Sequence, residues 1–203
     1  PVPKALFKDR ENASGLAWGA SSQRADLVEQ VEQYRHHQWV ESSWIEGAQA
    51  IGGARITAHN PADARDMVGE YCLASDDAIV QALDVADAAS SKWRMLPVAQ
   101  RAEILLRIAE QLESHRAELI ALCVREAGKT FPDALDDLRE AVDFCRYYAC
   151  QAQSLMGQAQ VMPGPTGEVN NYYWTGRGTF VCISPWNFPI AIPAWKIAPA
   201  LAF

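Results

Sequence analysis

The amino-terminal part of the chain changes from a helical to a strand-like pattern of apolar residues. Four apolar residues between positions 24 and 40 are separated by charged residues and predict an amphipathic helix: Leu27, Val31, Tyr34 and Trp39. Residues 54–58 and 67–71 then alternate between apolar and polar side chains, as strands do. Asn60-Pro61-Ala62-Asp63 lies between them and is rich in turn-forming residues, so this region predicts a β-hairpin.

Three more helices are predicted by apolar stripes and by residues typical of helix ends. The first begins at Ser75, whose hydroxyl can cap free amides, and its apolar face is Ile79, Leu83, Ala86 and Trp93. The second runs from Pro97 to Gly128, with an apolar face of Leu105, Ile108, Leu112 and Leu119. The third begins at Pro132 and ends near Gly157, with an apolar face of Leu138, Ala141, Cys145 and Tyr148. Such stripes are usually buried, so we expect these residues in the core.

Breaker residues at 162–167 separate these helices from the carboxyl-terminal part of the chain. Residues 168–174 predict an exposed aromatic strand, and a Gly-Arg-Gly turn at 176–178 leads into an apolar strand. That strand ends near Pro185, and a helix follows. A hairpin, helices, a strand, a turn and a helix in this order predict an α/β protein whose sheet is only begun here.

Composition and charge exclude several classes of protein. The 203 residues suffice for one large or two small domains, and 49% hydrophobic with 21% charged residues argues against general disorder. The net charge of −7 argues against a nucleic acid partner, which would need a clustered basic face.

The cysteines and histidines show no spacing typical of a metal site. An odd number of cysteines, five, favours reduced thiols in a cytoplasmic protein. The most apolar segment, 180–203, contains four prolines and Lys196, so no membrane span is predicted. Because the chain lacks an initiator Met and stops without a helix stop signal, we expect a piece of a longer polypeptide.

The run from Phe180 to Pro189 is the most informative stretch, because an apolar strand ends there in a turn that carries one amide. Pro185 and Pro189 flank Asn187, whose side chain is placed to donate a hydrogen bond into a pocket. Taken alone, such an Asn could instead satisfy backbone groups in a buried turn. The whole string Ile-Ser-Pro-Trp-Asn-Phe-Pro, however, resembles the signature of the aldehyde dehydrogenase superfamily, in which this Asn stabilises the oxyanion of the thiohemiacetal.

The resemblance implies roles for the neighbouring residues. Four of them would contact NAD: Ile183, Ser184, Pro185 and Trp186. Phe188 would line the aldehyde tunnel. The family binds NAD without the G-x-G-x-x-G loop, which this chain also lacks.

Cys182 is not expected to be the family's nucleophile. It has no neighbouring base or positive charge in the sequence to activate its thiol, so we expect it to be buried and structural. By resemblance, the cysteine nucleophile and the glutamate that activates water belong beyond Phe203, and this chain alone would be inactive.

Two stretches resemble more narrowly the dehydrogenase half of bifunctional proline utilisation A flavoenzymes. The first consists of residues 126–130 and 139–149, and the second of Pro163-Gly164-Pro165-Thr166-Gly167-Glu168 and residues 177–185. This implies that the full-length protein oxidises L-glutamate γ-semialdehyde to glutamate with NAD, the second step of proline catabolism. FAD would belong to a proline dehydrogenase half that is not present here.

The same resemblance implies a division of the chain. Residues 1–45 would be a linker and an amphipathic helix, and residues 46–203 the amino-terminal part of the NAD-binding domain: a β-hairpin, a helical layer and the first strand of a Rossmann-like sheet. Residues 168–175 would be an oligomerisation strand of a homo-oligomer. Residues 193–201 depart from the proline-catabolic branch, so an NAD(P)-dependent semialdehyde dehydrogenase of other specificity stays open as an alternative. A second alternative is a non-catalytic structural module, made of the hairpin, the helical layer and the exposed aromatic strand at 169–174.

Overall fold

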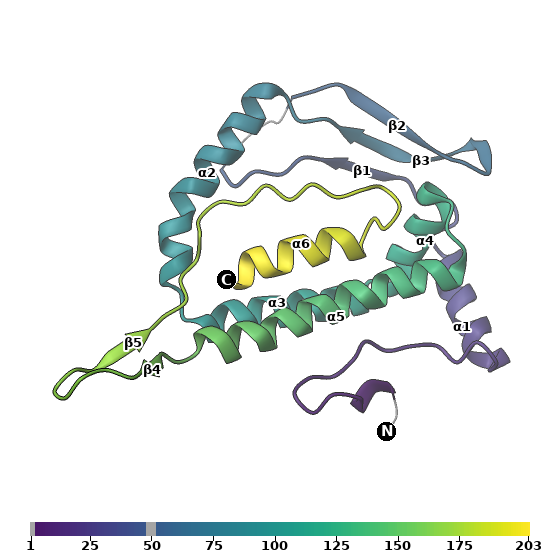
Figure 1. Ribbon diagram of the computed structural model, residues 1–203. Coiled ribbons are helices and arrows are strands. Elements are labelled where there is room, and N and C mark those ends of the chain that lie inside the picture. Colours follow the sequence, from purple (N-terminus) through teal and green to yellow (C-terminus); the bar gives the residue numbers. More distant parts are fainter. Residues whose placement is uncertain (1–2, 48–51) are drawn as a thin grey trace.

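A small sheet and a layer of helices make up the computed structural model, which describes residues 3–47 and 52–203 (Figure 1). β3 (Asp63–Cys72) is the central strand of the sheet. It pairs antiparallel with β2 (Arg55–Asn60) and parallel with β1 (Trp39–Ser42). The predicted β-hairpin is therefore confirmed, with both strands longer than predicted.

The prediction of a helix between residues 24 and 40 is wrong for residues 33–40. A short 3₁₀ helix (Pro3–Ala5) precedes α1 (Ser21–Glu32), and α1 buries Leu27 and Val31 as expected. Trp39, however, begins β1, and its indole Nε1 donates to Oε1 of Glu118 at 3.0 Å. The partner of β1 lies about thirty residues further along the chain, so a pattern within one short window could not reveal it.

α5 (Phe131–Met156) is the central helix of the layer and packs against α3 (Val98–Ser114), α4 (Arg116–Ala127) and α6 (Ala191–Ala202). The helix predicted over 97–128 is therefore two helices. His115 leaves the helical conformation, with φ −95° and ψ 20°, and separates α3 from α4. The predicted end at Gly128 is confirmed.

Buried side chains gather on both sides of α5. Small residues, among them Ala102, Ala149 and Ala198, let α3, α5 and α6 approach closely. Leu135 and Leu138 of α5 pack with α1 and α4 in a second cluster. The inward face predicted for α5 is confirmed for Leu138, Ala141 and Cys145.

The predicted burial of the first helical stripe is wrong for Ile79 and Leu83, whereas Ala86 and Trp93 are half-buried. α2 (Asp76–Met95) begins at the predicted Ser75 cap, but its Ile79 and Leu83 are 51% and 45% exposed. α2 lies at the margin of the molecule (Figure 1). It contacts α6 through Trp93, whose Nε1 donates to the carbonyl of Leu201 at 3.0 Å.

The carboxyl-terminal part contains a projecting arm and a long irregular segment. β4 (Gln160–Met162) and β5 (Asn170–Tyr172) pair antiparallel and extend away from the helices (Figure 1). The exposed strand predicted at 168–174 is thus present in shorter form. The apolar strand predicted to end near Pro185 is not formed, because no described residue pairs with it, so the expected first strand of a Rossmann-like sheet is absent here. The mixed α/β class is confirmed.

No helix among the described residues combines the length and the apolar character that crossing a membrane requires.

Candidate functional site

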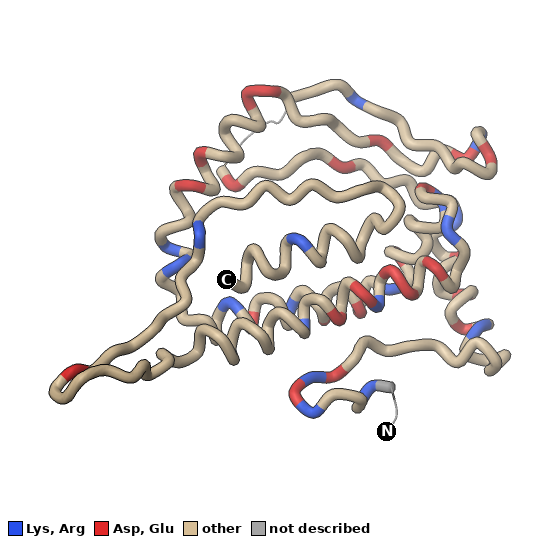
Figure 2. The backbone as a smooth tube through the Cα atoms, in the orientation of Figure 1, with Lys and Arg blue, Asp and Glu red and all other residues tan. Residues whose placement is uncertain are grey.

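The residues predicted to form the site lie together on the irregular segment between β5 and α6. Ile183 and Trp186 are 75% and 83% exposed, Asn187 and Phe188 are exposed, and Ser184 is half-buried. From Gly178 to Trp195 the chain carries no charged residue, which Figure 2 shows as a long tan stretch leading into α6. The segment therefore presents apolar side chains and one amide on an uncharged strip.

Three contacts hold this strip on either side of Asn187. Lys196 of α6 donates to the carbonyl of Ile183. The ammonium of Lys129 lies 4.5 Å from the ring centroid of Phe188. The backbone N–H of Ala191 donates to Oδ1 of Asp137 at 2.7 Å.

The Asn187 side chain itself makes no hydrogen bond to any other described residue. Its neighbours are held while its amide is free, which is the arrangement that a hydrogen-bond donor to a ligand needs. Lys196 has a structural contact, the hydrogen bond to the Ile183 carbonyl. No role for Lys129 or Asp137 was predicted from the sequence. A signal for Lys129 was present, because it lies between Gly128, which ends one helix, and Thr130, which caps the next.

The prediction that Cys182 is buried is wrong. Cys182 is exposed, because the strand expected to enclose it has no partner in the described part of the chain. All five cysteines are free thiols, as expected. Burial raises the pKa of Cys123 to about 12 and that of Cys145 to about 11, so neither is a thiolate near neutral pH.

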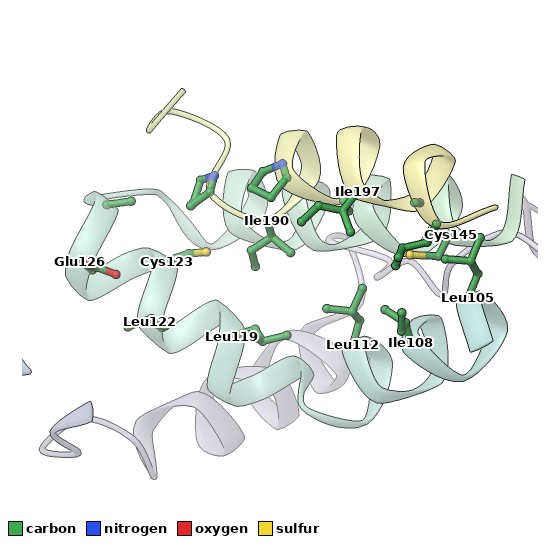
Figure 3. Close-up of a pocket in the computed structure, with 16 residues that line it drawn as sticks. Leu105, Ile108, Leu112, Leu119, Leu122, Cys123, Glu126, Cys145, Ile190 and Ile197 are labelled. Carbon is green, nitrogen blue, oxygen red and sulfur yellow. The ribbon is translucent and has the colours of Figure 1, made fainter. Parts of the chain in front are cut away.

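An apolar cavity of about 430 Å³ lies behind the turn, between α6 and the helices α3 and α4 (Figure 3). In Figure 3, Ile190 and Ile197 point from the α6 side toward Leu112 and Leu119. None of the residues 183–188 lines this cavity, so it is separate from the predicted site. Within residues 3–47 and 52–203, no three His, Cys, Asp or Glu side chains come close enough together to hold a metal ion.

The comparison with known families shows which family this chain belongs to. Residues 44–203 match the model of the aldehyde dehydrogenase family. The chain belongs to the aldehyde dehydrogenase family. Its irregular segment and α6 therefore carry an aldehyde dehydrogenase motif, and an unrelated protein with a similar turn is excluded.

Individual proteins match over most of this chain. It is 37% identical over 203 residues to the bifunctional protein PutA of Klebsiella aerogenes, covering 100% of this chain and 14% of that protein. It is 32% identical over 176 residues to the alpha-ketoglutaric semialdehyde dehydrogenase of Bacillus subtilis, covering 85% of this chain and 35% of that protein. The chain thus spans a small part of the length of these relatives.

A solved structure of an aldehyde dehydrogenase has a similar fold. It is the 1-pyrroline-5-carboxylate dehydrogenase from Thermus with bound NAD, with a TM-score of 0.88 and 28% identity over 97% of this chain and 38% of that one.

Proposed function

We propose that the full-length protein is an NAD-dependent aldehyde dehydrogenase that oxidises L-glutamate γ-semialdehyde to glutamate. The observation that carries the proposal is the free amide of Asn187 on a turn whose neighbours are fixed by Lys129, Asp137 and Lys196. The similarity to PutA and to the 1-pyrroline-5-carboxylate dehydrogenase from Thermus supports the choice of substrate.

Asn187 would act on charge that develops during the reaction. When a nucleophile attacks the aldehyde carbon, the carbonyl oxygen becomes an anion, and the Nδ2 amide of Asn187 donates a hydrogen bond to it. A donor that is already oriented stabilises this anion more than it stabilises the neutral aldehyde, and so it lowers the barrier. Phe188, next to it, would offer an apolar face to the carbon chain of the substrate.

The residues before Asn187 fit a flat, mostly apolar ligand such as a nicotinamide ring. Ile183 and Trp186 leave large apolar surfaces uncovered, and the half-buried hydroxyl of Ser184 lies between them in the sequence. Ile183, Ser184, Pro185 and Trp186 would hold this half of NAD. When bound, NAD would accept the hydride that the oxidation removes from the substrate.

The relatives also support a second candidate substrate. The 32% identity to an alpha-ketoglutaric semialdehyde dehydrogenase supports a semialdehyde of a different dicarboxylic acid. Comparing the kcat/KM of the full-length protein on L-glutamate γ-semialdehyde and on α-ketoglutaric semialdehyde separates the two possibilities. A higher value for the second compound would replace the first as the substrate.

The Asn187→Ala substitution tests the mechanism in the full-length protein. Loss of one oxyanion donor lowers turnover by roughly 10²- to 10³-fold, and we expect kcat to fall by this factor. Steady-state kinetics with saturating NAD measure the change. A decrease of less than about threefold would remove Asn187 from the mechanism.

We further propose that residues 1–45 are a linker and a helix in front of an NAD-binding domain that begins near residue 46, and that the strand at 168–175 joins subunits of a homo-oligomer. The exposure of Val169, Tyr173 and Trp174 on the projecting arm supports the second part.

A further inference from the structure

A buried ion pair lies directly under the turn that carries Asn187. Asp137, in the first half of α5, has a side chain that is 0% exposed, and the side chain of Lys129 is 12% exposed. Lys129 Nζ lies 3.3 Å from Oδ2 of Asp137, an ion-pair distance without the alignment of a hydrogen bond. Burying a carboxylate costs free energy of folding unless it is paired and hydrogen-bonded. The two contacts of Asp137 therefore show what stabilises it in the core.

Asp137 supplies the cap that α6 lacks. The residue before α6, Ile190, offers no side-chain cap, which leaves the first amides of the helix in need of acceptors. Oδ1 of Asp137 accepts from the N–H of Ala191, the first residue of α6. A carboxylate is also favoured at this end of a helix by the helix dipole.

Lys129 contacts the same turn from a second side. Its ammonium faces the ring of Phe188 at 4.5 Å, a cation–π contact, while it neutralises Asp137. Its own position is set by the neighbouring backbone, since Gly128 ends α4 and Thr130 caps α5. The pair therefore contacts Phe188, the residue after Asn187, and Ala191, four positions after Asn187.

We propose that Lys129 and Asp137 are positioning residues that hold the turn so that the amide of Asn187 stays in place. The catalytic part of this inference rests on the proposed function. The structural part, that the pair fixes the turn, does not.

Hydrogen exchange tests the structural part in the full-length protein without any assay of activity. Asp137→Ala removes the acceptor of the Ala191 amide, and we expect peptides covering residues 186–194 to exchange about tenfold faster or more. Asp137→Asn keeps an acceptor oxygen and should have a smaller effect. The matched control is Asp136→Ala, which removes the neighbouring carboxylate, 60% exposed and paired with Arg139 at 3.0 Å, and should leave exchange unchanged.

Lys129→Met should also speed exchange of these peptides, because it removes the cation that is paired with the buried carboxylate of Asp137. The double variant Lys129→Met/Asp137→Asn buries no charge and should exchange more slowly than Lys129→Met alone. Unchanged exchange in Asp137→Ala or in Lys129→Met would overturn the proposal.

A double-mutant cycle tests the catalytic part. If Asp137 acts through Asn187, Asp137→Ala should lower kcat by roughly ten- to a hundredfold, and should lower it no further in the Asn187→Ala background. Losses that multiply would show that Asp137 does not act through Asn187. If Asn187→Ala keeps its turnover while Asp137→Ala still speeds exchange, the proposed function fails and the positioning of the turn stands.

Discussion

At the scale of single residues, Arg125 shows how one buried side chain can join separate parts of the chain. Its guanidinium donates to both carboxylate oxygens of Asp66, at 2.7 and 3.3 Å, and to the carbonyls of Tyr34, His37 and Met67. It thus connects α4 to β3 and to the loop after α1. Hydrogen bonds from Arg125, and then from Asn60, lower the pKa of Asp66 from its usual value to about 2.

Arg125→Met should destabilise the region around α4 by roughly 1 to 3 kcal/mol, because half-buried Asp66 and three backbone carbonyls lose the donor they share. The loss can be measured at pH 7 from the urea dependence of amide exchange in α4. Arg65→Met is the control: Arg65 is 91% exposed and pairs with Asp63 on the surface, so the change should leave the stability of this region nearly unchanged. Equal effects of the two substitutions would contradict this interpretation of Arg125.

The pH dependence of this pair has a defined sign. The pKa of Asp66 is lower in the folded state than the usual value near 3.9, so folding favours the ionised carboxylate. The stabilisation is therefore fully present above about pH 4 and is lost as the pH falls through about 2. The difference in stability between the natural protein and Arg125→Met should shrink in that range.

At the scale of elements, the ends of the helices follow from local chemistry. Gly128 ends α4 with φ +66°, in the left-handed region where a side chain is strained. Thr130 then begins α5, since its Oγ1 accepts from the N–H of Asp133 at 3.3 Å. Both signals act within a few residues, so both could be predicted. The break at His115 could not, because the apolar spacing continues across it.

Gly128→Ala should destabilise the connection between α4 and α5 by roughly 1 to 2 kcal/mol, because alanine is unfavourable at positive φ. The added methyl group would also lie 3.0 Å from Cγ of Pro61. Gly19→Ala is a suitable control, since a Cβ there meets no atom within 4 Å and the backbone has no positive φ. Thermal unfolding of both variants measures the difference, and a more stable Gly128→Ala protein would contradict the argument.

At the scale of the whole molecule, the projecting β4–β5 arm has the most direct consequence. Val169 is 82% exposed, and Tyr173 and Trp174 beside it are also exposed, a pattern typical of a surface that another chain covers. We expect Val169→Asp together with Tyr173→Asp to lower the apparent mass of the full-length protein in sedimentation experiments. Thr166→Asp adds a charge to the same arm in its turn and should leave the mass unchanged. If the natural protein, the double variant and Thr166→Asp all have the same mass, the arm does not form the subunit interface.

The sequence by itself determined the features that depend on neighbouring residues. These include the hairpin around Asn60, the helix caps at Ser75 and Gly128, the buried face of α5 and the turn that carries Asn187. Backbone geometry and hydrogen bonds within a few residues produce each of them. A local pattern was therefore enough to predict them.

Only the tertiary structure decided how distant segments meet. It pairs β1 with β3, leaves Ile79 and Leu83 of α2 exposed, and brings Asp137 to the amide of Ala191, 54 residues away. Such contacts depend on the packing of whole helices and strands, and the identities of the residues nearby do not encode them. The sequence thus identified the turn that carries the candidate oxyanion donor, and the folded chain revealed the buried pair beneath that turn.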